Sequence, residues 1–535
     1  CEHGCVDGEG CADPCVEGSV ICIDGGASTC VEGDYTDPEP CSDACVDEVG
    51  CVACVPGSTT CEDGNSMMCD DDGQGYELSE LCDGVQGVFC NEDVGVCDGD
   101  CAPDNLQLDY LGCEYYATVT QQYDTGIQGT DFFTITVSNT ADVETDVTID
   151  GNGVNLNFTV APNSVVRQKL PWVNALYKGT GPSKVVSDGA YRIRANHPVT
   201  VIQYSPIDAD VTNDASLLLP VNAWTGSAMV ASYPFWINQL NNNIRTPGFY
   251  AVTASQDNTT VQLSPSATGN VVQPGSGVAA DGTGEVTLDR GDVLQVVTSL
   301  EAGDLTGTMI SADKPVQLIA GHSCTEVPQG DLACDHLEES MPPIEALSDT
   351  YVVMPPVQTP NNDMFHGEVV RVIASEADTA VVFTPDIGED ITLENAGDFI
   401  DIPVGTQRYL VEADKKILVA QYMVGAQGGF GQSDPSMALA VATGQYRKDF
   451  LIHAPPTWQA NYANLIAPLG AMVEVDGEVV PEINFTAIPE TDYMTATVLM
   501  PEGLGLNQQS IEPIGLSCVI TAALIACLYF ARMLV

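Results

Sequence analysis

Two histidines and two cysteines stand almost symmetrically in the middle of the chain, as His322-x-Cys324 and Cys334-x-His336, with Glu338 and Glu339 following. Two sulfur and two nitrogen ligands at this spacing could hold a zinc ion tetrahedrally. The two cysteines could instead form a disulfide, Cys324–Cys334, that closes a ten-residue loop. In an oxidising compartment the disulfide is the expected state. We therefore predict a structural loop here and no metal site.

Signatures of catalysis are missing elsewhere. The sequence has no G-x-S-x-G, H-E-x-x-H or phosphate-loop pattern. Ser433 precedes Asp434, but adjacency does not make a triad, and the internal repeats described below make Asp434 a structural position. The run Asp70-Asp71-Asp72-Gly73 lacks the ligand spacing of an EF-hand loop, so a solvated turn is expected. We predict no catalytic residue and no cofactor, and calcium is the one cofactor that the acidic composition leaves open.

Cysteines are concentrated near the start of the chain, with 17 of the 21 at or before Cys113. Sets of six with similar spacing begin at Cys1 and Cys41, and a looser set begins at Cys82. So dense a cluster, with one histidine and few paired C-x2-C spacings, indicates disulfides rather than zinc. Six cysteines allow 15 pairings, so connectivity stays open. We predict a loop-rich stalk or spacer outside the cytoplasm, secreted or at the cell surface.

Charge is strongly one-sided: 16 basic residues stand against 75 acidic ones, a net charge of −59. Such a surface repels nucleic acids and anionic membranes. Neither is therefore an expected partner. The acidity suits a soluble protein in salty surroundings or one that collects cations.

Beyond Cys113 the texture changes to short alternating β-type runs separated by Gly, Asp, Asn and Pro. In VEVDGEVV, Asp476-Gly477 between two such runs predicts a hairpin. No long helical period appears, so the expected fold class is all-β: small disulfide-rich repeats followed by tandem β-sandwich-like units.

Three segments of the β region superpose without gaps: 192–204, 309–321 and 410–422. Asn196, Asp313 and Asp414 correspond, and with the His/Lys and Pro positions after them they predict a tight turn. The apolar run that follows predicts a strand buried on both faces. A fourth copy reaches Pro513, which aligns with Pro198 and Pro315 of the first two copies. The expected domains are 1–113, 114–234, 235–356, 357–456, an incomplete unit 457–513, and an apolar tail 514–535.

Four tryptophans lie near the joins between these units: Trp172, Trp224, Trp236 and Trp458. Packing in a core or between units is the ordinary interpretation. A platform for stacking sugars is the alternative, since aromatic faces also pack on carbohydrate.

The two ends of the chain leave membrane attachment open. Ile514–Ala531 carries no charge and Arg532 follows it, which is the length of a borderline membrane span. The segment starts inside the fourth repeat, so a truncated strand is the preferred interpretation over an anchor. Cys1 at the start fits a removed leader, a fragment, or a lipid-modified cysteine.

Several stretches carry a resemblance to a known family. They are GHSCTEVPQGDLACDHLEESMPP (321–343), SDPSM (433–437), QYRKDF (445–450) and NY before VEVDG. With the cysteine-rich repeats ahead of them, they resemble the IgGFc-binding protein N-terminal domain family, in the form found in large secreted bacterial proteins. The resemblance implies an extracellular, non-catalytic β module for adhesion or surface interaction. The expected partner is an extracellular protein or a glycan. The alternatives are a structural spacer stabilised by calcium and, less favoured, a secreted polysaccharide hydrolase.

Overall fold

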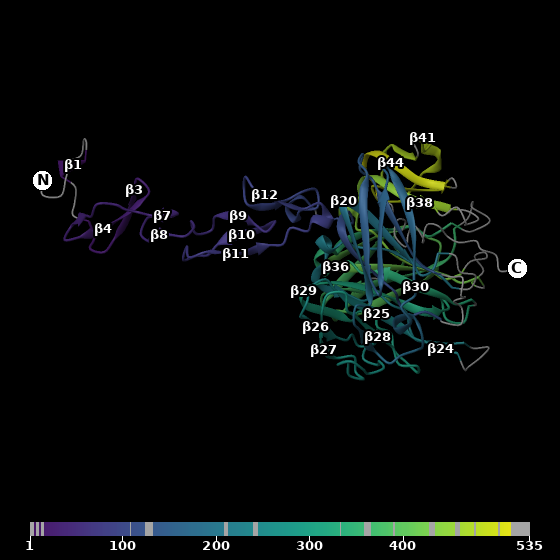
Figure 1. Ribbon diagram of the computed structural model, residues 1–535. Coiled ribbons are helices and arrows are strands. Elements are labelled where there is room, and N and C mark those ends of the chain that lie inside the picture. The colour runs from purple at the N-terminus through teal and green to yellow at the C-terminus, as the bar shows by residue number, and fades with distance from the viewer. Residues whose placement is uncertain are drawn as a thin grey trace. The chain divides into compact units, whose positions relative to one another are not determined.

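The computed structural model divides the chain into two compact units, Cys1–Asn105 and Leu106–Val535 (Figure 1). Strands dominate both units, which confirms the predicted all-β class. Among the described residues, no helix is long and apolar enough to span a lipid bilayer. The structure describes residues 5–6, 10–11, 15–106, 109–123, 132–207, 212–238, 244–331, 333–357, 365–388, 391–426, 428, 434–454, 461–475, 478–500 and 503–514.

The helices described are short. The one α-helix is α1 (Asn174–Tyr177), and the 3-10 helices are η1 (Gly84–Gln86), η2 (Pro103–Asn105), η3 (Val221–Ala223), η4 (Ile344–Ala346), η5 (Thr443–Gln445) and η6 (Glu482–Asn484).

The N-terminal unit contains two stapled modules with the same disulfide pattern. The first, 15–51, is closed by Cys15–Cys30, Cys22–Cys45 and Cys41–Cys51. The second, 54–97, is closed by Cys54–Cys69, Cys61–Cys90 and Cys82–Cys97. In both, the first cysteine pairs with the third, the second with the fifth and the fourth with the sixth. The sets of six cysteines defined by spacing begin at Cys1 and Cys41, whereas each closed module begins at the fourth cysteine of such a set. The sequence did not reveal this offset.

Short strands form these modules because most of their residues are turns and polar loops. The strands of the modules are β3 (Val20–Ile23), β4 (Gly26–Val31), β5 (Asp34–Tyr35), β6 (Glu39–Pro40), β7 (Ala44–Val46), β8 (Gly50–Val52), β9 (Thr59–Glu62), β10 (Asn65–Cys69), β11 (Tyr76–Glu80), β12 (Phe89–Asn91) and β13 (Val96–Asp98). Two further strands, β1 (Cys5–Val6) and β2 (Gly10–Cys11), precede them.

The C-terminal unit contains three sheets of similar design, each built on one long strand. The first comprises β14 (Gly112–Thr118), β15 (Phe133–Asn139), β16 (Thr145–Gly151), β17 (Val154–Val160), β18 (Ser164–Leu170), β20 (Ala190–Tyr204) and β21 (Ala215–Leu217). The second comprises β19 (Lys184–Val186), β22 (Thr225–Met229), β25 (Gly248–Ala254), β26 (Thr259–Ser264), β27 (Gly284–Leu288), β28 (Val293–Val297), β29 (Met309–Thr325) and β30 (Asp335–Ser340). The third comprises β31 (Ser348–Val353), β32 (Glu368–Ala374), β33 (Thr379–Thr384), β34 (Ile391–Leu393), β35 (Phe399–Gly405), β36 (Tyr409–Met423) and β37 (Met437–Leu439).

The predicted tight turns at Asn196, Asp313 and Asp414 are wrong, because each lies inside a continuous long strand: β20, β29 or β36. Each side chain accepts a main-chain N–H from a neighbouring strand: Asp146 N for Asn196 at 2.8 Å, Thr260 N for Asp313 at 2.8 Å, and Ala380 N for Asp414 at 2.9 Å. The polar side chain therefore stabilises the position at which the long strand stops pairing with one neighbouring strand and begins pairing with another. The predicted burial of the following apolar half is confirmed.

The fourth region has two separate sheets in the described part of the chain. One contains β38 (Arg447–Ala454), β40 (Val473–Val475), β41 (Glu478–Val479) and β44 (Gly503–Ile514), and the other contains β39 (Asn461–Pro468), β42 (Thr486–Ala487) and β43 (Tyr493–Met500). β40 and β41 pair antiparallel on either side of Asp476-Gly477, which itself lies outside the described residues. A separate hairpin joins β23 (Trp236–Ile237) to β24 (Arg245–Thr246).

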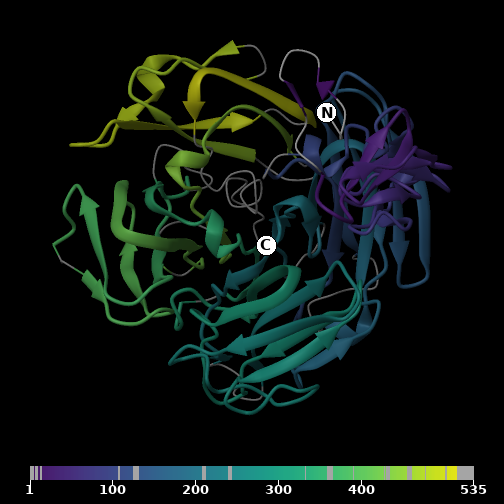
Figure 2. The same ribbon diagram turned by 90° about the vertical axis from the view of Figure 1, so that its left-hand side faces the viewer.

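The sheets of Leu106–Val535 pack side by side around a common centre, as Figure 2 shows. We call this arrangement the β ring. Ile319 of the second sheet packs in the core of the first, and Leu418 of the third packs in the core of the second. Ile466 of the fourth region packs against the third sheet, and Leu465 packs against the first, which closes the ring.

The second sheet, the third sheet and the sheet of β44 each contain a strand from the preceding repeat. β22, β31 and β38 lie near the ends of the predicted units 114–234, 235–356 and 357–456, yet they pair with β29, β36 and β44 respectively. This exchange ties consecutive repeats together. The predicted limits of the β units as domains stay a prediction.

Candidate functional site at the centre of the β ring

Three short strands, β21, β30 and β37, bring carboxyl groups from three repeats together. We call the group Asp214, Asp335, Glu338, Glu339 and Asp434 the acid seam. Asp214 lies at its middle: one oxygen accepts the N–H of Ala215 at 3.0 Å, and the other accepts those of Glu338 at 3.0 Å and Met437 at 3.3 Å. Burial raises the pKa of Asp214 well above its ordinary value, although these N–H groups act in the opposite direction.

Glu338 lies on the first sheet's side of the seam and has no exposed surface. Its Oε1 accepts hydrogen bonds from Gln203 Nε2 at 2.7 Å and Ser216 Oγ at 3.1 Å. Its Oε2 accepts a short hydrogen bond from the Thr120 hydroxyl and lies 3.4 Å from His336 Nε2. All of these groups are buried, so the carboxyl is held by polar neighbours rather than by water.

Of the other seam acids, Asp335 and Glu339 are buried and Asp434 is partly buried. Asp335 accepts the N–H groups of His336 at 2.7 Å and Asn213 at 2.8 Å, and burial together with nearby Asp434 raises its pKa well above the ordinary value. Burial raises the pKa of Asp434 to about 6. Burial, and secondarily Asp214, raises the pKa of Glu339 well above its ordinary value. Burial therefore favours the protonated form of Asp214, Asp335 and Glu339, because a buried charge without a counter-charge is costly.

The histidine–cysteine group of the sequence lies beside the seam. Cys324 and Cys334 form a disulfide with 5.3 Å between their Cα atoms. His322 is fully buried, and its Nδ1 accepts the N–H of Cys324 at 3.1 Å. Burial, and then the neighbouring His336, lowers the pKa of His322 to about 3, so its ring is neutral. Within the described ranges, no three His, Cys, Asp or Glu side chains are placed to hold a metal ion.

A related arrangement occurs in the third sheet. Gln421, level with Gln203 in the repeat alignment, donates from Nε2 to Glu368 Oε2 at 2.8 Å and to the carbonyl of Met354 at 3.1 Å. Gln203 likewise donates to Glu338 and to the carbonyl of Thr118. Burial raises the pKa of Glu368 to about 8. A buried glutamine–glutamate pair is therefore a recurrent feature of the ring.

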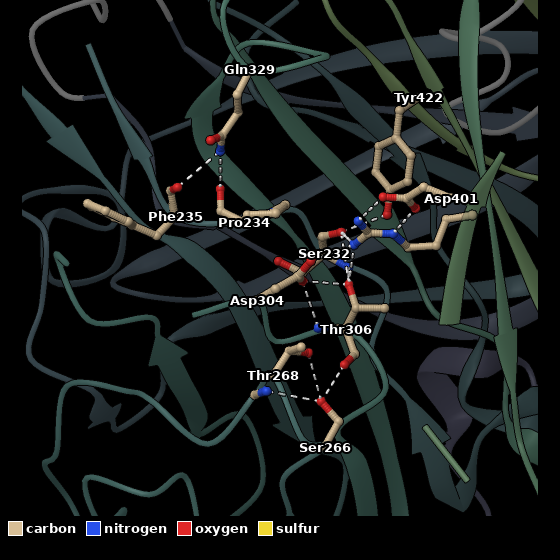
Figure 3. A network of polar contacts seen from close by, with 12 residues as sticks. Ser232, Pro234, Phe235, Ser266, Thr268, Asp304, Thr306, Gln329, Asp401 and Tyr422 are labelled. Atoms are coloured by element: carbon tan, nitrogen blue, oxygen red, sulfur yellow. Dashed lines mark hydrogen bonds and ion pairs between the residues drawn. The ribbon is translucent and has the colours of Figure 1, made fainter. Parts of the chain in front are cut away.

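A charged network between the second and third sheets contrasts with the seam, because its charges are paired. The Arg371 guanidinium contacts Asp401 through two hydrogen bonds, at 2.7 and 2.8 Å, and Asp304 at 2.7 Å. It also packs 4.1 Å from the ring centre of Phe399. Figure 3 shows Asp304 and Thr306 beside Ser232, with Asp401 and Tyr422 facing them. This network fixes one sheet to the next.

Neither cluster presents an open site. The seam acids Asp214, Asp335, Glu338 and Glu339 are at most 4% exposed. A cavity beside Trp224 has a volume of about 10 Å³, room for one water at most. Asp214, Asp335, Glu338 and Glu339 are therefore almost closed to solvent in the described structure, and Asp214 contacts all three sheets.

The sequence did not predict the acid seam, because in a chain with 75 acidic residues the spacing of carboxyl groups along the sequence does not distinguish one group of them from another. A signal was nevertheless present. The stretches 321–343 and 433–437, singled out for their family resemblance, contain Asp335, Glu338, Glu339 and Asp434. Asp70 forms a turn, accepting the N–H of Gln74 at 2.7 Å. Cys1, Ser433, Trp458 and 515–535 lie outside the described residues.

Comparisons with known proteins match the part of the chain that carries the seam. A family model described as IgGFc binding protein matches residues 214–518. The IgGFc-binding protein of Homo sapiens is 25% identical over 291 residues, which cover 54% of this chain and 5% of that protein. The chain therefore spans about a twentieth of the length of this relative. No solved structure matches significantly.

Proposed function

The chain belongs to the IgGFc binding protein family, and on this premise we propose that it is an extracellular, non-catalytic protein that binds another protein through its β ring. The observation that carries the proposal is the family match over residues 214–518, which includes the whole acid seam. The human relative is named for binding the Fc part of IgG. The stapled modules then act as a spacer, and their six described disulfides suit an oxidising environment. The bacterial form of the family stays a prediction.

The burial of the acid seam supports a non-catalytic role. A glycoside hydrolase needs two carboxyl groups facing a sugar, roughly 5–10 Å apart in an accessible cleft. Asp214, Asp335, Glu338 and Glu339 are buried between three sheets, and hydrogen bonds from the main chain occupy Asp214 and Asp335. The seam is thus suited to holding the ring in one shape for recognition.

The tryptophans support a protein partner rather than a glycan. Trp224 and Trp236 are 6% and 2% exposed, and their indole N–H groups bond to Leu219 O at 2.8 Å and Glu326 Oε2 at 3.2 Å. Trp172 packs against Tyr177 with 5.0 Å between ring centres. These ring faces contribute to packing, so a sugar has no free tryptophan to stack on among these three.

Binding of the full chain to immobilised IgG Fc, to Fab and to a panel of extracellular proteins, beside a glycan array, tests the proposal. We expect at least one protein ligand with a Kd below about 10 µM. The Arg371→Met variant, which weakens the ring and leaves the stapled modules unchanged, should bind less. Binding to glycans alone, or turnover of a polysaccharide, would overturn the proposal. A rise in Tm with calcium but no protein ligand would favour the spacer alternative.

A further inference from the structure

The second stapled module has a sheet edge with no neighbour. Its sheet runs β11–β10–β9, and within the described residues β11 pairs with β10 alone. An unpaired strand presents a row of main-chain N–H and C=O groups to any extended segment that can lie beside it. The corresponding strand of the first module, β5, is only two residues long.

Apolar side chains follow this edge. Tyr76 and Leu78 stand two residues apart on β11 and so point to the same side of the sheet. They are 38% and 55% exposed. Leu78 lies directly opposite Met67 of β10, which extends the apolar strip across the sheet. These exposed side chains lie next to the open main-chain groups of β11, so an added strand could pack apolar side chains against them.

The charge of the module restricts the partner. Residues 54–97 contain ten acidic residues and no Lys, Arg or His: Glu62, Asp63, Asp70, Asp71, Asp72, Glu77, Glu80, Asp83, Glu92 and Asp93. Glu77 lies on β11 between the two apolar residues and points to the opposite face. A second copy of this module would bring another uncompensated acidic surface, which disfavours self-pairing.

We propose that the open edge of β11 binds an extended, basic segment of a partner protein by adding it as a strand. Main-chain hydrogen bonds supply affinity, and Tyr76 and Leu78 accept apolar side chains on one face. Basic side chains on the other face meet Glu77 and its acidic neighbours. This site lies in the stapled unit and is independent of the partner site proposed for the ring.

The test uses the full chain and a fluorescein-labelled ten-residue peptide of alternating lysine and valine, with anisotropy measured at 50 and 150 mM NaCl. Two control peptides replace lysine by glutamate or every second valine by proline, which cannot complete a strand ladder. Leu78→Lys is compared with Val94→Lys, an equal change of charge at a residue that is 53% exposed and lies off the edge strand.

We expect the lysine–valine peptide to bind, and Leu78→Lys to weaken binding at least tenfold while Val94→Lys changes it less than threefold. The glutamate and proline peptides should not bind. Equal effects of the two variants, or equal binding of the proline peptide, would show general attraction to a polyanion and overturn the proposal. Leu78→Thr, with disulfides checked by non-reducing mass mapping, repeats the comparison in a variant suited to a strand. Fc binding measured on the same variants separates this site from the ring.

Discussion

Asp214 and Glu338, which lie 124 residues apart, are joined by a hydrogen bond of 3.0 Å from the main-chain N–H of Glu338 to the Asp214 carboxyl. The same oxygen accepts the N–H of Met437. One buried side chain therefore connects the first, second and third sheets at the centre of the ring. Because burial raises the pKa of Asp214 well above its ordinary value, this connection is sensitive to protonation.

Replacing Asp214 by alanine should destabilise the ring by about 3 kcal/mol or more, because buried N–H groups lose their acceptor at about 1–3 kcal/mol each. Urea unfolding followed by tryptophan fluorescence measures the change. Asp349→Ala, at an exposed residue whose carboxyl accepts the hydroxyls of its neighbours Ser348 and Thr350, is the matched control and should change stability by less than about 0.5 kcal/mol. Equal effects would contradict a central role for Asp214.

The stability of the ring should fall as pH rises from about 5 to 9. Glu368 has a folded pKa of about 8, raised by burial from an ordinary value near 4.5. The folded state therefore favours protonated Glu368. The resulting contribution to the free energy of unfolding is fully present below the unfolded pKa and is lost as the pH rises through 8. Glu368→Gln should flatten this part of the profile in unfolding measured at constant salt. The exposed Glu301→Gln should leave the profile unchanged, and a profile equally steep in both variants would refute the assignment.

Arg371→Met should cost about 3–5 kcal/mol, since removing one partner leaves Asp304 as a buried, uncompensated charge. Adding Asp304→Asn to Arg371→Met should recover part of the lost stability, because a neutral amide then replaces the unpaired buried carboxylate. A double-mutant cycle by urea unfolding gives the coupling. The exposed Arg290→Met serves as the control. Strictly additive effects would show that the two side chains do not depend on each other.

The stapled modules should give six linked peptide pairs when protease digestion and mass spectrometry are done without reduction. The expected links in the first module are Cys15–Cys30, Cys22–Cys45 and Cys41–Cys51, with the same order repeated in 54–97. Each module is closed on itself, so cleavage between Cys51 and Cys54 should separate them. A link from one set of six to the other would contradict this organisation.

The pairing of β39 concerns the apolar tail 514–535, for which the sequence leaves open a membrane anchor or a truncated strand. β15, β25 and β32 each have a neighbour on both sides, whereas β39 pairs only with β43 among the described residues. The interpretation of residues 514–535 as the end of a truncated β unit, rather than as an anchor, stays a prediction. A chain ending at Ile514 should then melt about 5 °C or more below a chain ending at Cys527. Equal Tm values, with detergent needed only when the tail is present, would favour an anchor.

Residue type and spacing alone determined the broad character of this protein. Dense cysteines predicted the stapled N-terminal part, and alternation with turn residues predicted an all-β remainder, because both signals are local. The repeat of Asn196, Asp313 and Asp414 was also visible, but its meaning was misread. Asn and Asp favour turns locally, whereas here a neighbouring strand donates an N–H to each of these side chains and the long strand stays continuous.

Only the tertiary structure decided the rest. The pairing of the cysteines depends on their proximity in three dimensions. The sequence therefore could not show that each closed module begins at the fourth cysteine of a set defined by spacing. The closing of the sheets into a ring depends on both faces of strands such as β32 finding apolar neighbours. The acid seam depends on Asp214, Glu338 and Asp434 meeting across more than two hundred residues. In a chain with 75 acidic residues, only burial distinguishes the few that hold the ring together from the many that face solvent.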